Sequence, residues 1–425
     1  MRRIAAVAIP ALLLLSAGLL TLNQAFVALA VPFVAMIFVD GLLLVEPGRL
    51  TVTRFVETRR LEEGDTTWVR VRVENAGPSL RDVTVRDIVP FGLEVVRKTQ
   101  DTFSNLPQGE SLEFSYAVRV PRGYFVHQAV SVTYRGGLGL IEKSQDYRVS
   151  SEVFGVPRPQ SLRQIAFRPR STLLNSGAHP ARVGGTGLEF FDIRRYMPGD
   201  RMRHVNWRAT GRRWEELYIN DFEQERVADI ALILDARSRA YALSKTFHAS
   251  VHAAATLAQH FSGEGNRISL LVYGGAVDWT PPGFGKRHYE RISRALAKAK
   301  IGDNQVFSDF GGLPRRLFPG SIQLALISPV LKDDVGYIAL LRRHGYGVLV
   351  VSPDAVEAEA AEGDLENTED QNIRWALRFE RVQRRAIVRS LRREGVLVVD
   401  WRPTDSLADV LYRETRAFAA AGRMR

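Results

Sequence analysis

The chain has 425 residues, of which 45% are hydrophobic and 25% are charged, and it carries a formal net charge of +11. This length predicts two or three soluble domains besides any membrane part, and the composition lets each of them bury a core. The sequence contains no cysteine, which excludes disulfides, thiolate metal sites and a cysteine nucleophile. The positive charge favours an acidic partner: anionic lipid, nucleic acid or an acidic protein surface.

Two long apolar runs stand near the start of the sequence. Ile4–Leu22 contains no charged residue, and Ala25–Val45 contains only Asp40. Each run approaches the roughly 20 apolar residues that a helix needs to cross a bilayer core, and the short polar link between them is typical of a tight turn. We therefore predict a transmembrane helical hairpin over residues 1–46.

Positive charge flanks this hairpin on both sides. Arg2 and Arg3 precede it, and four arginines follow it between residues 49 and 60. This pattern predicts a cell-membrane protein with two spanning helices and a cytoplasmic soluble body. The alternative is a cleaved signal peptide, but the second apolar run argues against it. Asp40 is either a functional charge within a span or a residue that reaches the membrane interface.

A domain rich in strands is predicted over residues 49–156. Val69, Val71 and Val73 alternate with charged residues, as expected of strands with one buried face. Turn signals punctuate the strands, which favours an antiparallel β-sandwich. The segment VENAGPSLRDVTVRDIVPFGLEVV resembles immunoglobulin-like repeats of bacterial and archaeal surface proteins. The sandwich carries no catalytic cluster, so we interpret it as a spacer or interaction module.

Residues 157–186 are rich in Pro, Ser and Gly and are predicted to form a linker. The stretch that follows, Gly187–Arg213, combines large aromatics with arginines and few carboxylates. Such a set either binds an anion or pins an extended segment to the next domain, and we favour the second interpretation. It predicts that Tyr196 and Trp207 are packing anchors. It also predicts that Asp200 pairs with one of Arg194, Arg203, Arg208 and Arg212.

This stretch resembles the signature of the membrane-protein family catalogued as domain of unknown function 58. The family pattern is Arg-x-Tyr-x-x-Gly-Asp-x-x-Arg-x-Ile-x-Trp-x-x-x-Ala-Arg, followed by Leu, an aromatic and Glu. Val205 and Gly211 depart from it conservatively, and Asn220 stands where a basic residue is usual. The matching residues are Arg194, Tyr196, Gly199, Asp200, Arg203, Trp207, Arg212, Leu217, Phe222 and Glu225.

The rest of the region 187–425 reads as a doubly wound α/β domain. Buried strands are predicted at 230–236, 267–273, 322–328, 346–352 and 395–400, and helices at 246–261, 287–300, 333–344, 372–394 and 406–421. This alternation predicts a parallel sheet covered on both faces, with its ligand position at the carboxyl ends of the strands.

The family resemblance implies that this domain is similar to a von Willebrand factor type A domain. Metal-binding members carry Asp-x-Ser-x-Ser after the first strand. Here Asp235 and Ser238 remain, but Arg237 and Arg239 occupy the two serine positions. Two guanidiniums repel a divalent cation, so we predict a degenerate site that holds no metal. The two arginines either replace the charge of the metal and contact an acidic partner group directly, or they are solvated in a relic loop.

Two further patterns carry hypotheses. His248, His252 and His260 recur at helical spacing, which suits zinc, but the sequence lacks the Glu of a zinc protease motif, and partly buried histidines are the preferred interpretation. Arginines from Arg374 to Arg392 form a basic stripe along one predicted helix. The stripe faces anionic lipid or an acidic protein, or it is neutralised by the acidic segment 354–370; no nucleic-acid-binding motif accompanies it.

These observations predict a membrane-anchored, non-enzymatic scaffold or adaptor that needs no cofactor and presents a type A-like interaction domain. The family resemblance implies a protein partner, a MoxR-type AAA+ ATPase, and membrane lipid is the second partner; nucleic acid is not expected. The alternative function is a metal-dependent ligand-binding or adhesion module. The sequence contains no motif that supports an enzyme.

Overall fold

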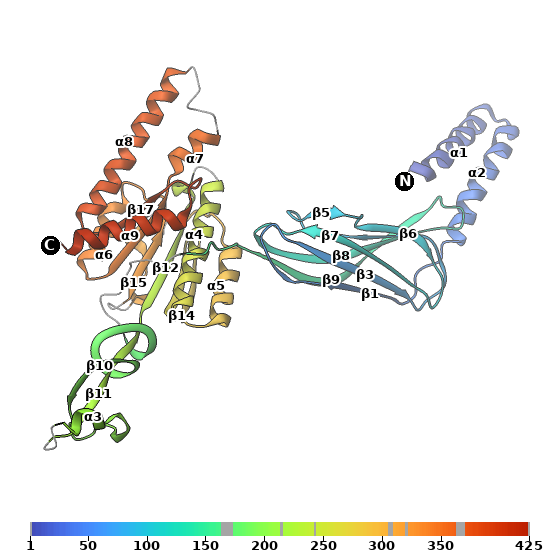
Figure 1. Ribbon diagram of the computed structural model, residues 1–425. Coiled ribbons are helices and arrows are strands. Elements are labelled where there is room, and N and C mark those ends of the chain that lie inside the picture. Colours follow the sequence, from blue (N-terminus) through green and yellow to red (C-terminus); the bar gives the residue numbers. More distant parts are fainter. Residues whose placement is uncertain are drawn as a thin grey trace. The chain divides into compact units, whose positions relative to one another are not determined.

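The structure is a computed structural model that describes residues 2–162, 173–212, 216–241, 244–304, 309–318, 322–362 and 370–423. It divides into two compact units, Met1–Val156 and Pro157–Arg425, which correspond in colour to the blue-to-cyan and green-to-red parts of Figure 1. The boundary coincides with the predicted end of the strand-rich domain at residue 156.

The first unit begins with two apolar helices, α1 (Arg2–Thr21) and α2 (Gln24–Leu42). The Asn23 side chain caps α2 by accepting a hydrogen bond from the Ala25 amide at 3.0 Å, which fixes the tight turn between the helices. Both helices are long enough and apolar enough to cross a membrane. They expose large apolar side chains such as Leu19 and Leu20, at 80% and 84%. The prediction of two apolar helices is confirmed.

Asp40 joins the end of α2 to the β-strand region. Its fully buried carboxylate accepts three backbone hydrogen bonds, from Leu138, Leu140 and Ile141, at 2.6 to 2.9 Å. These amides lie in the turn between two strands, so a loop of the β region wraps around the helix end. Asp40 is therefore an internal anchor between α2 and the loop 138–141, a role that the sequence did not predict.

The remainder of the first unit is two antiparallel sheets that share one core. The strand orders are β1-β3-β7-β5 and β2-β9-β8-β4-β6, with one short parallel pairing between β2 and β9. Val69, Val71 and Val73 of β3 are fully buried, which confirms the predicted alternation. The strands are β1 (Leu50–Val56), β2 (Arg60–Glu62), β3 (Thr66–Asn75), β4 (Leu80–Asp87), β5 (Glu94–Arg97), β6 (Asp101–Leu106), β7 (Ser111–Arg119), β8 (Gly123–Arg135) and β9 (Glu142–Val156).

A charged pair is buried in this sandwich. Arg54 donates to both carboxylate oxygens of Asp87, and the side chains of both residues are inaccessible to solvent. The Tyr116 hydroxyl also donates to Asp87, at 2.6 Å, and the His127 ring lies 3.9 Å from the same carboxylate. Burial lowers the pKa of His127 from 6.5 to about 4, more than Asp87 raises it.

The second unit is built on a six-stranded sheet with the order β14-β13-β12-β15-β16-β17. All neighbouring pairs are parallel except β13–β14. Each predicted strand is found within a few residues: β12 (Asp229–Ala236), β13 (Arg267–Gly274), β15 (Gln323–Ile327), β16 (Gly347–Pro353) and β17 (Leu397–Trp401). The edge strand β14 (Val277–Gly283) was not predicted, because its two prolines disguise a strand that pairs on one side only.

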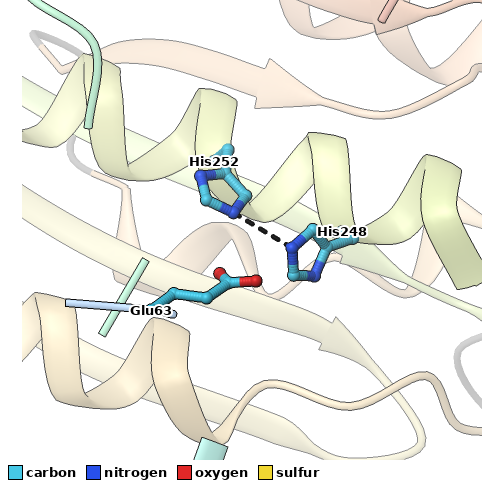
Figure 2. Close-up of side chains that lie close together, drawn as sticks. All are labelled: Glu63, His248 and His252. Atoms are coloured by element: carbon cyan, nitrogen blue, oxygen red, sulfur yellow. Dashed lines mark hydrogen bonds between the residues drawn. The ribbon is translucent and has the colours of Figure 1, made fainter. Parts of the chain in front are cut away.

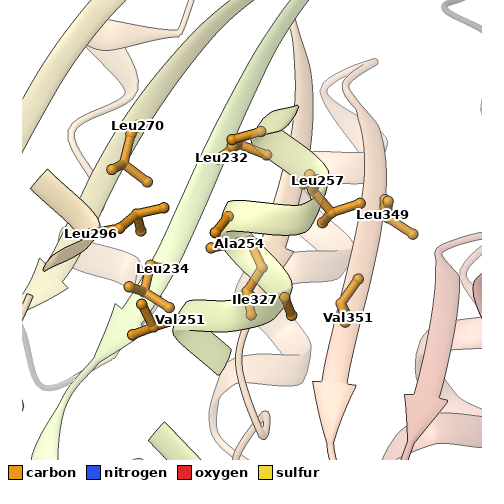
Figure 3. Close-up of a cluster of buried hydrophobic side chains, with 14 of the residues drawn as sticks. Leu232, Leu234, Val251, Ala254, Leu257, Leu270, Leu296, Ile327, Leu349 and Val351 are labelled. Atoms are coloured by element: carbon orange, nitrogen blue, oxygen red, sulfur yellow. The ribbon is translucent and has the colours of Figure 1, made fainter. Parts of the chain in front are cut away.

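Helices cover both faces of this sheet (Figure 1). One core cluster joins the sheet to α4, α5 and α9, and Figure 3 shows Val251, Ala254 and Leu257 of α4 facing strand residues such as Leu232. A second cluster joins the opposite face to α6 and α8. The described helices are α4 (Ser244–Gly263), α5 (Lys286–Lys298), α6 (Asp334–Arg343), α7 (Ala355–Glu362), α8 (Gln371–Arg393) and α9 (Leu407–Arg423), and of these only α7 was not predicted.

The predicted linker over residues 157–186 is wrong from residue 173 onward, where a strand begins. Its first residues lie against α4, where the Gln160 amide donates to Thr256 Oγ1 at 3.1 Å. Residues from 173 onward belong to β10 (Leu173–Arg195), which pairs with β11 (Tyr218–Val227) in an antiparallel hairpin with several register shifts. The Pro and Gly residues that signalled a linker are tolerated because this two-stranded ribbon is irregular and has free edges. Residues 163–172 lie outside the described part of the chain.

The buried histidine gives the sandwich a predictable pH dependence. The folded state holds His127 neutral down to about pH 4, whereas the unfolded chain protonates it near pH 6.5. The unfolded state therefore binds more protons in this window, so stability falls as the pH falls through it, by on the order of 2 kcal/mol between pH 7 and pH 5. Hydrogen exchange of the β8 amides measures this loss. His127→Gln, which cannot protonate, should lack it, and parallel pH curves for the two proteins would contradict the account.

Candidate functional site

The carboxyl edge of the parallel sheet is closed by a guanidinium. Asp235 stands near the end of β12, and Arg237 turns back onto it, with Nε and Nη2 donating to the two carboxylate oxygens at 2.9 and 2.8 Å. Nη1 and Nη2 donate to the two oxygens of Asp334, at the start of α6, at 2.9 and 2.8 Å. The Arg237 guanidinium thus makes a bidentate ion pair on each side, which is its strongest binding geometry.

This cluster is buried and its remaining polar atoms are satisfied. Asp235 and Asp334 are inaccessible and Arg237 is 3% exposed. The Ser328 hydroxyl donates to Asp235 at 2.6 Å, and the Phe310 ring lies 4.1 Å from the guanidinium carbon. Burial on its own lowers the pKa of Arg237, but the hydrogen bonds to both carboxylates outweigh it and raise that pKa above its ordinary value. The arginine is therefore a permanent cation in the position where open α/β sheets bind ligands.

The residues that the sequence singled out at this edge differ in their burial and in their partners. Arg237 is 3% exposed and neutralises the chain's own carboxylates, so it is not the solvated residue of a relic loop, and its guanidinium is not open to a partner group. Arg239 is exposed, and its closest carboxylate oxygen belongs to Asp333 at 3.8 Å. The Ser238 hydroxyl bonds to the carboxylate of Asp303. Asp334 was missed; its only signal was a carboxylate at the start of a predicted helix.

The signature segment forms the end of the β10–β11 hairpin. Arg194 donates to both oxygens of Asp200 at 2.8 Å. Of the four arginines that the sequence offered as partners of Asp200, Arg194 is therefore the one that pairs with it. Asp200 also accepts from the Met197 amide at 2.7 Å and closes a turn in which Gly199 has a φ of +106°, a conformation that favours glycine. The pair with Arg194 and the bond to Met197 together lower the pKa of Asp200. These contacts fix the backbone of the turn.

A second set of contacts holds the other side of the tip. Asn206 caps the short helix α3 (Trp207–Thr210) by accepting from the Ala209 amide at 2.9 Å, and its side-chain amide donates to Asn220 at 2.6 Å. Val205 is buried and pairs with Ile219 of β11. The local structure therefore rests on polar side chains and one small apolar contact.

The large side chains of this tip point into solvent. Trp207 is 68% exposed, Met197 64% and Met202 55%, and Arg203 and Arg212 are also exposed. The prediction that Trp207 is a packing anchor is therefore wrong, and Tyr196 is only half-buried. Trp207 begins the short helix α3 at the end of a two-stranded ribbon, which offers this helix no second layer to pack against. We refer to Met197, Met202, Arg203, Trp207 and Arg212 together as the tip surface.

The three histidines of α4 do not come together as the alternative interpretation, a zinc site, would require. Figure 2 shows His248 and His252 one turn apart, with their Nε2 atoms 3.1 Å from each other. Both are half-buried, as preferred from the sequence, and His252 Nδ1 lies 3.1 Å from the carbonyl oxygen of Arg158. His260 lies 3.2 Å from Glu264 instead. In the second unit, the contact between His252 and Arg158 anchors the segment after residue 157 to α4.

Part of the hairpin and most of the parallel sheet lie in a segment that matches a family model. Residues 192–395 match the family model described as "Protein of unknown function DUF58". The resemblance found in the signature segment is confirmed over this range.

The chain is also similar to curated proteins. The "Uncharacterized protein YeaD" of Bacillus subtilis (strain 168) is 27% identical over 274 residues, which cover 63% of this chain and 67% of the relative. The "Uncharacterized protein Rv1480" of Mycobacterium tuberculosis is 28% identical over 125 residues, 28% of this chain and 39% of the relative. The chain thus spans about two-thirds of the first relative's length and about two-fifths of the second's.

Solved structures resemble this chain only weakly. A FixG-related protein from Vibrio parahaemolyticus matches with a TM-score of 0.18 and 10% identity, covering 26% of this chain and 98% of that one. A CARDB domain from Pyrococcus furiosus matches with a TM-score of 0.19 and 16% identity, covering 27% of this chain and 93% of that one. Likeness at this level carries no functional information.

Replacing the buried arginine tests the role of the closed edge. Arg237→Ser leaves two carboxylates buried without their cation, so it should cost on the order of 3–5 kcal/mol in urea unfolding of the second unit. Arg239→Ala, which removes an exposed arginine in the same loop, should cost about 1 kcal/mol or less.

The same variant tests the prediction about metal. Calorimetry of the native chain with magnesium, manganese or calcium should give no stoichiometric binding. Arg237→Ser leaves a set of oxygen ligands without their cation, so magnesium should bind this variant and restore part of its stability. Saturable binding to the native chain that Asp235→Ala abolishes would refute the account.

Proposed function

We propose that this chain is a membrane-anchored, non-enzymatic adaptor that binds a protein partner through the tip surface. The observation that carries the proposal is the exposure of Trp207 and Met202 beside Arg203 on a turn that the Arg194–Asp200 pair holds in place. Large apolar side chains on solvent-exposed ribbons reduce solubility unless a partner covers them.

The composition of the tip surface suits protein recognition. Tryptophan, methionine and arginine are enriched at the centres of protein interfaces, where a few such residues carry most of the binding energy. The bidentate pair and the Asn206 cap order the backbone before binding, so less conformational entropy is lost in the complex. The two exposed arginines favour an acidic patch on the partner.

The partner follows from the family resemblance. That resemblance implies a MoxR-type AAA+ ATPase, and we propose that its acidic surface binds the tip. We further propose that the sheet of the second unit is a type A-like domain whose cation position is taken by Arg237. A metal-dependent adhesion function is disfavoured, because the carboxylates that would bind the metal already share this guanidinium.

The anchor is the α1–α2 hairpin. Its two helices have a mean hydropathy of 2.3 over the candidate spans, and arginines flank them on both sides. We propose that both helices cross the cell membrane and that the rest of the chain is cytoplasmic, following the distribution of positive charge. The bonds of Asp40 to the loop 138–141 would then hold the sandwich directly beneath the bilayer.

Single cysteines test this topology, since the native chain contains none. Gln24→Cys lies at the start of α2, next to the turn between the helices, and should react with a membrane-impermeant maleimide in intact cells. Gln108→Cys lies in an exposed turn of the sandwich and should react only after lysis. Labelling of position 108 in intact cells would refute the cytoplasmic body.

The tip surface is tested by pairing binding with stability. Trp207→Ala should weaken capture of the MoxR-type ATPase by on the order of 2 kcal/mol, or about thirtyfold, as expected of an interface hot spot. Because Trp207 is already exposed, the free energy of unfolding of this variant, measured by thermal melting, should change by no more than about 0.5 kcal/mol. Arg203→Ala should behave in the same way.

Phe284→Ala is the matched control, because Phe284 is 71% exposed and lies in the same unit away from the hairpin. It should leave both binding and stability unchanged. If Trp207→Ala binds the ATPase as well as the native chain does, the tip is not the docking surface. If it melts substantially earlier, Trp207 is a packing residue after all.

A further inference from the structure

Helix α8 changes character along its length. Its 23 residues include eight arginines and one glutamate. In the half nearer its end, Val388 and Leu391 are buried against the sheet. In the half nearer its start, Trp375, Phe379 and Val382 are 61%, 61% and 64% exposed. Figure 1 shows that this first half projects beyond the sheet.

The exposed apolar side chains form one strip. Trp375, Phe379, Val382 and Ala386 recur every three or four residues and therefore share a face of the helix, turned away from the buried Leu391. A row of arginines lies beside this strip, and the guanidinium of one of them, Arg378, lies 5.4 Å from the Trp375 ring. We call the strip and this row the α8 face; its members are Arg374, Trp375, Arg378, Phe379, Val382, Arg385, Ala386 and Arg389.

The arginines of the α8 face differ from the others of the helix. Arg381 pairs with Glu357 at 2.9 Å, and Arg392 pairs with Glu414 at 2.9 Å. Among the described residues, no carboxylate forms an ion pair with Arg374, Arg385 or Arg389. The hypothesis that segment 354–370 neutralises the stripe therefore applies to Arg381, while residues 363–369, with their three acidic side chains, lie outside the described part.

From this arrangement we propose that the α8 face lies on the anionic surface of a phospholipid bilayer. A helix with aromatic and aliphatic side chains on one face and arginines beside them inserts its apolar strip among the acyl chains while the guanidiniums bind lipid phosphates. Tryptophan favours this boundary. The charge of the arginine row is complementary to anionic lipid and selects it over zwitterionic lipid.

The proposal rests on the membrane anchor proposed above. A chain that is tethered by α1 and α2 presents α8 to the bilayer at a high effective concentration, so a weak surface affinity suffices. A projecting, convex helix suits insertion into a lipid surface better than it suits a protein groove, which would have to enclose it. The α8 face is separate from the tip surface, so the chain has one surface for lipid and another for a protein.

The test uses the full chain reconstituted into vesicles. Ala386→Cys places a single cysteine in the strip, where a polarity-sensitive fluorophore reports insertion and spin-labelled lipid reports contact. Gly263→Cys is the control, since this residue is exposed at the end of α4 and an added Cβ there has no neighbour within 4 Å. Vesicles are made of phosphatidylcholine alone or with phosphatidylglycerol, and flotation after a high-salt wash measures anchoring separately.

We expect the probe at position 386 to shift to the blue and to be quenched by spin-labelled lipid in phosphatidylglycerol vesicles, but not in phosphatidylcholine or in 1 M salt, where attraction is screened over about 3 Å. The control probe should respond in none of them. Replacing Arg374, Arg378 and Arg385 together by Gln should lower the ratio of bound to free α8 by about tenfold or more.

Trp375→Ser with Phe379→Ser should abolish the signal without changing the thermal melt, because both side chains are already exposed. A floating chain whose position-386 probe remains in water in phosphatidylglycerol vesicles would overturn the proposal. So would equal quenching in both lipids, or shielding that appears only when a protein is added. A chain that fails to float would instead refute the anchor.

Discussion

One guanidinium between two buried carboxylates closes the edge of the parallel sheet at which a ligand would otherwise bind. Arg237 joins Asp235 at the end of β12 to Asp334 at the start of α6, which are 99 positions apart in the chain, and it leaves none of the three exposed. Removing the cation would leave two negative charges unpaired in a poorly solvated site, so the cluster stabilises the fold only when all three charged groups are present. Because it fills the edge where such sheets bind ligands, binding surfaces have to be sought elsewhere on the molecule.

Those surfaces lie on the projecting elements of the second unit. The tip surface combines exposed methionine and tryptophan with arginine on a turn that is fixed internally by Arg194 and Asp200. The α8 face combines Trp375 and Phe379 with arginines, such as Arg374 and Arg385, that form no ion pair with the described carboxylates. The arginines behind the net charge of +11 thus fall into two groups. Those that are paired in the core stabilise the fold, and those that are unpaired on projecting elements favour acidic partners.

Periodicity predicted most of the fold, since burial and spacing are local properties. Apolar runs located the five parallel strands, and alternation identified Val69, Val71 and Val73 as core residues. It failed where the answer depends on distant neighbours. The paired prolines of β14 are compatible with a strand only because that strand lies at an edge, and residues 173–186 are a strand rather than a linker only because β11 lies beside them.

The candidate site shows the same division. A carboxylate in a turn usually accepts a hydrogen bond from a donor that is close in the sequence. The sequence therefore offered four arginines as partners of Asp200, and one of them, Arg194, is correct. It did not reveal that Asp334 binds Arg237, nor that Trp207 has no second layer to pack against. Both facts depend on which elements meet in space.

We propose that the protein partner binds the tip surface and not the sheet edge. Photocrosslinking in living cells tests it most directly, with a photoreactive amino acid at Met202 and, for comparison, at Ser238 beside the closed edge. The account predicts an adduct with a MoxR-type AAA+ ATPase from position 202 and none from position 238. An adduct with that ATPase from position 238 alone would contradict it.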